Sequence, residues 1–159
     1  MQKQNVLILV ENRLLKLEDL KLVAYPDSAG NPTIGAGTRE IDGRKVTLQD
    51  TCTKAQAIMW LRNRIEEDYN RLELFCNMHN IELLDNQAAS ILLFIYNAGF
   101  TAFQNSSMAK DLISGQVDKV VTDLLKWDKI TVDGKLVFSP GLLNRREEEA
   151  KCFVDEGKC

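Results

Sequence analysis

The chain has 159 residues, of which 45% are hydrophobic, and its formal net charge is −3. This length and apolar content suit one compact unit with a substantial core, and the slightly acidic balance gives no basic footprint for nucleic-acid binding. No segment approaches the run of about 18 apolar residues that a membrane-spanning helix needs.

The first predicted element is an amphipathic helix over residues 3–18. Val6, Val10 and Leu14 recur at helical spacing, and Glu18 closes the helix. The apolar run at the start is too short for the core of a signal peptide, and no small-residue cleavage site follows it. We therefore expect a protein made in the cytoplasm without a signal peptide.

Residues 22–48 have a different character. Glycines and prolines separate short runs such as LVAY, TIGAG and KVTL, a pattern typical of hairpins and turns. The capping box Thr53-Lys-Ala-Gln56 then predicts the start of a long helix that ends near residue 78. The sequence thus predicts a small β-containing lobe over residues 20–50.

The second half of the chain is predicted to be helical. The segment Asn86–Asn97, NQAASILLFIYN, is apolar nearly all round, which is typical of a helix buried on every side. Shorter helices are expected near 106–114 and 116–127, followed by a loop or small hairpin around Asp133-Gly134. A last helix, rich in charge, is expected over Leu142–Val154.

These elements predict an α+β, mostly helical fold. A larger helical lobe, made of residues 1–19 and 51–159, is expected to surround the buried central helix. The smaller β-hairpin lobe is expected to face it across a cleft, a common place for a substrate site. We treat residues 1–159 as a single domain.

The cysteines give no sign of a metal site. Cys52, Cys76, Cys152 and Cys159 show no C-x-x-C spacing, and His79 is the only histidine, so a zinc ion would need unusual ligands. For a cytosolic protein we expect reduced thiols. A bond between Cys152 and Cys159 after release is compatible with the sequence but is not required by it.

Three polar residues near the end of the first helix suggest acid–base chemistry. Glu18 lies where the helix dipole and partial burial both favour a protonated carboxyl group. Asp27 follows in a polar turn with backbone amides nearby, which suits a carboxylate that stays charged. Thr33 supplies a small hydroxyl that can hold a water molecule. One protonated and one charged carboxyl group are what glycoside hydrolysis requires.

Spacing alone favours a simpler interpretation of the same residues. Glu18 then ends a solvated helix, Asp27 is an Asx-turn residue, and Thr33 is a β-branched strand former.

The segment LEDLKLVAYPDSAGNPTIGAGT resembles the active-site region of phage-type lysozymes, the endolysins of glycoside hydrolase family 24. Their motif is Glu, eight residues, Asp, five residues, Thr, and here Glu18, Asp27 and Thr33 meet it. Residues 97–107 resemble the family block N-x-G-x-x-x-F-x-x-S. Residues 140–153 resemble the block G-L-x-x-R-R-x-x-E-x-x-x-F. The resemblance therefore spans nearly the whole chain.

The resemblance implies hydrolysis of the β-1,4 bond between N-acetylmuramic acid and N-acetylglucosamine in peptidoglycan. It implies that Glu18 is the general acid, that Asp27 is the base or the electrostatic partner of the attacking water, and that Thr33 positions that water. Inversion is also implied, with the two carboxyl groups about 6.5–9.5 Å apart. Arg145 is expected to approach the catalytic glutamate. No cofactor or metal is implied.

Further candidates for sugar binding are Asn97, Gln104 and Asn105, although Asn97 fits a helix C-cap equally well. The chain also departs from the family pattern in two places. Asp19 replaces the usual glycine after the catalytic glutamate, and Thr38-Arg39 stand where the family has His-Thr.

The predicted function is an endolysin-like muramidase from a phage or prophage, which acts as a monomer on the glycan strands of the bacterial wall. A holin-like membrane protein is the expected partner for release, without nucleic-acid binding or stable membrane insertion. Two alternatives remain open. One is a non-catalytic protein that keeps the fold to bind wall glycan or to serve a structural role, an alternative that Asp19 keeps open. A lytic transglycosylase would need only one acid.

Overall fold

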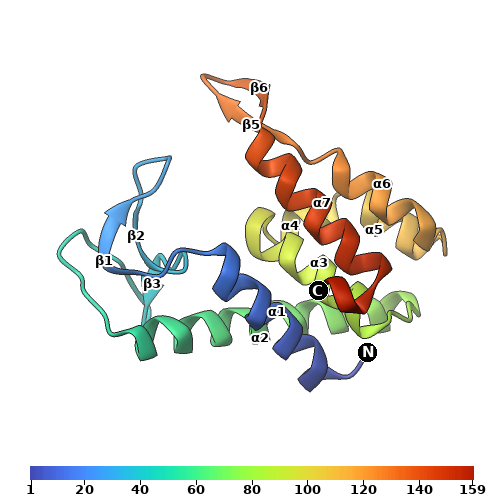
Figure 1. Ribbon diagram of the computed structural model, residues 1–159, viewed down its shortest axis with the longest axis horizontal. Helices are drawn as coiled ribbons and strands as arrows, with labels where there is room; N and C mark the ends of the chain where they lie inside the picture. The colour runs from blue at the N-terminus through green and yellow to red at the C-terminus, as the bar shows by residue number, and fades with distance from the viewer. The chain divides into compact units, whose positions relative to one another are not determined.

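The structure, a computed structural model that describes residues 1–159, is mostly helical and carries three two-stranded antiparallel hairpins (Figure 1). It confirms the predicted fold class. The chain forms two compact units. One consists of residues 11–67, and the other consists of residues 1–10 together with 68–159. None of the helices combines the length and the apolar character that crossing a membrane demands.

The unit of residues 11–67 holds the end of the first helix, two hairpins and the start of the second long helix. In chain order these elements are α1 (Lys3–Leu17), β1 (Lys21–Pro26), β2 (Pro32–Gly35), β3 (Glu40–Ile41), β4 (Arg44–Lys45) and α2 (Lys54–His79). The predicted capping box opens α2. The Thr53 amide donates to Gln56 Oε1 at 2.8 Å, and the Gln56 amide donates to Thr53 Oγ1 at 3.1 Å.

The second unit is built around the helix that the sequence marks as apolar on all sides. Its further elements are α3 (Asp85–Ala98), α4 (Phe100–Gln104), α5 (Ser107–Ile113), α6 (Val120–Leu125), β5 (Lys129–Val132), β6 (Lys135–Phe138) and α7 (Pro140–Val154). Every residue of α3 from Ala88 to Ile95 is buried, and α7 packs against both α3 and α6 (Figure 1). The prediction of a buried central helix is confirmed.

Local signals explain two boundaries in this unit. Asp133 and Gly134 have φ angles of 49° and 76° and form the two-residue loop between β5 and β6, as expected for an Asp-Gly hairpin turn. The last helix begins earlier than predicted, at Pro140, because Ser139 Oγ accepts a hydrogen bond from the Leu142 amide at 3.3 Å. Proline is well suited to the first helical position after such a cap.

The end of the chain corrects one expectation. Cys152 and Cys159 form a disulfide, so the prediction of reduced thiols is wrong for this pair. A short 3₁₀ turn over residues 156–158 brings the chain back to the end of α7, which places the two Cα atoms 4.4 Å apart, within bonding range. Cys52 and Cys76 are free thiols. Burial raises the pKa of Cys76 to about 11.

Candidate active site

The first member of the candidate triad lies at the C-terminal end of α1. The Glu18 amide donates to the Leu14 carbonyl at 2.7 Å, which extends the helical bonding pattern by one residue. The side chain is half-buried. Glu18 therefore lies at the negative end of the helix dipole, as predicted.

The neighbouring Asp19 turns toward solvent and toward the start of β1. Its side chain is 77% exposed, and its carboxylate lies 2.5 Å from the Lys21 ammonium group. This hydrogen bond raises the pKa of Lys21. The additional carboxylate at this position is thus solvated and paired with a positive charge, which weakens its field at the end of α1.

Asp27 occupies the turn between β1 and β2 as a charged carboxylate. Its Oδ1 accepts hydrogen bonds from the amides of Asn31 at 2.8 Å and Ala29 at 2.9 Å, and its Oδ2 contacts the Arg39 guanidinium. These contacts, the Asn31 amide first, hold the pKa of Asp27 below its usual value. The expectation that the polar turn keeps this carboxylate charged agrees with this geometry.

Thr33 is bound to the same turn. It lies on β2 opposite Tyr25, is 2% exposed, and donates from Oγ1 to the Asn31 carbonyl at 3.0 Å. The peptide groups of Asn31 therefore contact both Asp27 and Thr33. Because the Thr33 proton is used in this bond, its oxygen keeps free lone pairs that can accept a hydrogen bond from water.

A tight reversal follows Thr33. Ile34 and Thr38 exchange two backbone hydrogen bonds of 2.9 and 2.8 Å. The reversal requires Gly35, whose φ is 65° and whose missing Cβ would lie 3.4 Å from the Ala57 Cβ. This Ile-Gly-x-Gly turn brings the chain back so that Arg39 meets Asp27.

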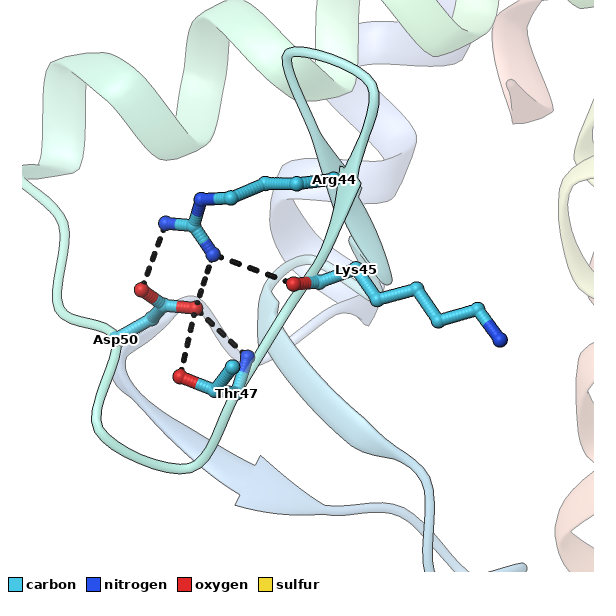
Figure 2. A network of polar contacts seen from close by, with 4 residues as sticks. All are labelled: Arg44, Lys45, Thr47 and Asp50. Atoms are coloured by element: carbon cyan, nitrogen blue, oxygen red, sulfur yellow. Dashed lines mark hydrogen bonds and ion pairs between the residues drawn. The ribbon is translucent and has the colours of Figure 1, made fainter.

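A polar clamp, made of Arg44, Thr47 and Asp50, fixes the next segment (Figure 2). Arg44 binds both oxygens of the Asp50 carboxylate at 2.8 and 2.9 Å, and the Thr47 amide donates to the same carboxylate at 2.7 Å. The Arg44 hydrogen bonds, followed by the Thr47 amide, hold the pKa of Asp50 well below its usual range. The clamp joins β4 to the start of the segment that leads into α2.

Asp50→Asn is expected to destabilise the fold at neutral pH and to flatten the dependence of stability on pH. The pKa of Asp50 is lower in the folded than in the unfolded chain. Its contribution is therefore full above about pH 4 and is lost as the pH falls toward the folded-state value. Urea unfolding at pH 6 and pH 3 should show a smaller difference for the variant than for the native chain. An equal difference would contradict the clamp.

In the second unit, α7 buries one arginine of its charged run. Arg146 is 1% exposed, donates to the Trp127 carbonyl at 3.1 Å, contacts Glu149 and Asn97, and lies 4.8 Å from the centre of the Phe94 ring. We call Arg146, Glu149 and Asn97 the buried polar cluster. Asn97 is held in this cluster, whereas Gly99 is the residue that caps α3.

The other predicted supporting residues lie in the same unit. Arg145 is 16% exposed and its Nε lies 3.4 Å from Glu149 Oε1. Gln104 ends α4 and Asn105 caps it, both with exposed side chains. The approach of Arg145 to Glu18, and the sugar-binding roles of Asn97, Gln104 and Asn105, stay predictions.

Sequence reasoning missed two of the residues that build these sites. Arg39 occupies a position where the family pattern has a different residue, and nothing near it in sequence points to Asp27. Arg146 belongs to the run RREEE, whose charges suggest exposure, although its spacing of three residues from Glu149 allows a pair on one helix face.

Known proteins match the chain over most of its length. An endolysin of Acyrthosiphon pisum secondary endosymbiont phage 1 is 32% identical over 139 residues, covering 87% of this chain and 90% of that protein. The endolysin of Salmonella phage P22 is 31% identical over 144 residues, covering 89% and 92%. Among solved structures, the endolysin from Escherichia coli O157:H7 phage FAHEc1 superposes with a TM-score of 0.81. It is 34% identical and covers 98% of this chain and 95% of its own.

A sequence model of the family described as phage lysozyme matches residues 15–149, a range that includes the three candidate catalytic residues and both arginines of α7. The family match, the related sequences and the shared fold all indicate the same family. The chain therefore belongs to the phage lysozyme family and is a glycoside hydrolase.

Proposed function

We propose that the chain is an inverting muramidase that cleaves the β-1,4 bond between N-acetylmuramic acid and N-acetylglucosamine. In this proposal Glu18 is the general acid, and Asp27 and Thr33 hold the attacking water. The observation that carries the assignment is the turn at Asn31, whose backbone binds a charged carboxylate and a buried hydroxyl side by side. Hydrolysis of peptidoglycan itself is the activity of the family.

Glu18 suits the role of the acid. Departure of a sugar hydroxyl requires a proton on the glycosidic oxygen, and Glu18 supplies a half-buried carboxyl group at the end of α1 that can donate it. The proton moves from the Glu18 carboxyl group to the leaving oxygen as the bond to the anomeric carbon breaks.

Asp27 and Thr33 are suited to hold the attacking water. A water molecule can donate one hydrogen bond to the Thr33 oxygen and the other to the Asp27 carboxylate, which leaves a lone pair for the anomeric carbon. Hydrogen bonds that keep Asp27 charged also make it a weaker base. This favours Asp27 as the electrostatic partner of the water and of the positive charge that develops on the sugar ring. The Asp27 carboxylate then takes the proton of the water once its oxygen has bonded to the anomeric carbon and become strongly acidic.

The partner of the chain is the peptidoglycan strand. We propose that the protein acts as a monomer and that a holin-like membrane protein gives it access to the wall. Neither role requires a cofactor or a metal.

Product analysis tests the function with the native chain. Defined peptidoglycan is digested in water enriched in oxygen-18, and the released muropeptides are analysed by mass spectrometry, with NMR of the fresh anomeric signals. A muramidase gives muramic acid at the reducing end with one heavy oxygen, and inversion gives the α-anomer first. Reducing N-acetylglucosamine ends, unlabelled anhydro ends, or the absence of soluble products would each contradict the proposal.

A further inference from the structure

The side chain of Arg39 holds the carboxylate that the proposed mechanism needs in its charged form. We propose that Arg39 is a positioning residue that fixes the orientation and charge of Asp27 and thereby sets the low-pH limit of wall hydrolysis. This inference rests on the proposed function of Asp27 and adds a residue that lies outside the triad.

The two oxygens of the Asp27 carboxylate are held from different segments. Oδ1 accepts from two amides of its own turn, those of Ala29 and Asn31. Oδ2 contacts the Arg39 guanidinium, which is twelve residues further along the chain. Without Arg39, the turn still holds one oxygen, but the second oxygen loses the partner that fixes the plane of the carboxylate. Arg39 therefore controls the oxygen that the turn leaves available to a water molecule.

The fold fixes the backbone from which Arg39 reaches Asp27. The reversal at Ile34–Thr38 comes immediately before it, and the Arg39 carbonyl accepts a hydrogen bond from the amide of the buried Val46 at 2.9 Å. The Arg44–Asp50 clamp then joins the β3–β4 hairpin to the chain that leads into α2 (Figure 2). The Arg39 side chain is 63% exposed, but its backbone is fixed by the hydrogen bonds of Thr38 before it and of its own carbonyl.

No other positive charge contacts Asp27. The titratable side chains on the neighbouring segments are Glu18, Asp19, Lys21, Tyr25, Glu40, Asp42, Arg44, Lys45 and Asp50. Lys21 is paired with Asp19, and Arg44 is paired with Asp50. The ion pair of Asp27 is formed with Arg39.

The sign of the pH effect follows from this contact. Hydrolysis requires charged Asp27, so activity falls when the pH drops through the pKa of this carboxyl group. The amide of Asn31 and that of Ala29 lower this pKa, and the guanidinium in contact with Oδ2 lowers it further because it also favours the charged form. Removal of the guanidinium therefore moves the acidic limb of the pH profile upward, toward neutral pH.

The test compares Arg39→Gln with Arg62→Gln. Arg62 is a matched control because its side chain is 64% exposed, belongs to the same unit and pairs with a carboxylate, that of Glu11. For Arg39→Gln, the acidic limb of kcat/KM on soluble glycan strands should move upward by roughly half to one pH unit. Arg62→Gln should keep the acidic limb of the native chain. Arg39→Lys, which retains the charge, should shift the acidic limb less than Arg39→Gln does.

A carbon-13 NMR titration of the Asp27 carboxyl group provides a readout that does not depend on activity. If the pKa of Asp27 and the acidic limb both rise in Arg39→Gln, the inference is supported. If neither rises, Arg39 does not set the charge of Asp27 and the inference is overturned, while the proposed function stands. If the pKa of Asp27 rises but the acidic limb of the pH profile does not move, activity does not depend on charged Asp27. That result overturns both the inference and the proposed role of this carboxylate.

Discussion

Glu18→Gln is expected to slow wall hydrolysis by roughly 10²–10⁴-fold without loss of the fold. Glutamine has nearly the same size and keeps the helix end intact, but it cannot donate a proton to the leaving glycosidic oxygen. The initial rate of turbidity loss of a purified cell-wall suspension measures the effect. Circular dichroism and the thermal midpoint of the same samples report whether the fold is retained.

Asp19→Asn is the matched control for this variant. It replaces a carboxyl group by an amide one residue away, on a side chain that is 77% exposed and paired with Lys21. Its rate should stay close to that of the native chain. If Glu18→Gln cleared walls as fast as the native protein, Glu18 would not be the acid. If both variants lost activity equally, the effect would come from the charge near the helix end.

Arg146→Met is expected to destabilise the protein by about 3–5 kcal/mol. The substitution leaves Glu149, itself 1% exposed, without its closest cation, and it removes the donors to the Trp127 carbonyl and to Asn97. The loss falls toward the lower end of this range because Arg145 still lies 3.4 Å from Glu149. Thermal unfolding should show a midpoint lowered by roughly 10 °C.

Two further variants define the cause of that loss. Lys151→Met removes an exposed cation from the same helix, paired with Glu148, and should cost no more than about 0.5 kcal/mol. The double variant Arg146→Met with Glu149→Leu should be more stable than Arg146→Met alone, because the buried carboxylate is no longer left without a strong partner. Equal midpoints for Arg146→Met and Lys151→Met would contradict a structural role of the buried polar cluster.

Much of the fold is predictable because its signals are local. Each signal is contained in the segment whose structure it determines. Examples are the all-round apolar composition of α3, the capping box of Thr53 and Gln56, and the Asp133-Gly134 turn. Helical periodicity also places Glu18 at the end of α1. These predictions need no knowledge of what packs against the segment.

The parts that sequence reasoning missed depend on residues that are distant in the chain. Arg39 reaches Asp27 only because a glycine-dependent reversal returns the chain, and Arg146 meets Asn97 across a separation of 49 residues. A charged run on a helix gives no local sign of which of its members is buried. The disulfide at the chain end likewise depends on a 3₁₀ turn that the sequence did not indicate.

The division of the chain into units has a consequence for its synthesis. The unit that contains α3 also contains residues 1–10, and the Gln2 amide and the Asn5 side chain both bind the Asp85 carboxylate, at 2.5 and 3.0 Å. Residues 1–10 thus find these partners only after the whole of residues 11–67 has been synthesised, and contacts of such long sequence separation form slowly. The hydrogen bonds that join Asp27 and Thr33 to residues 29–31 connect near neighbours in the chain and can form first. A nascent chain therefore contains its candidate catalytic turn before the helical core can close.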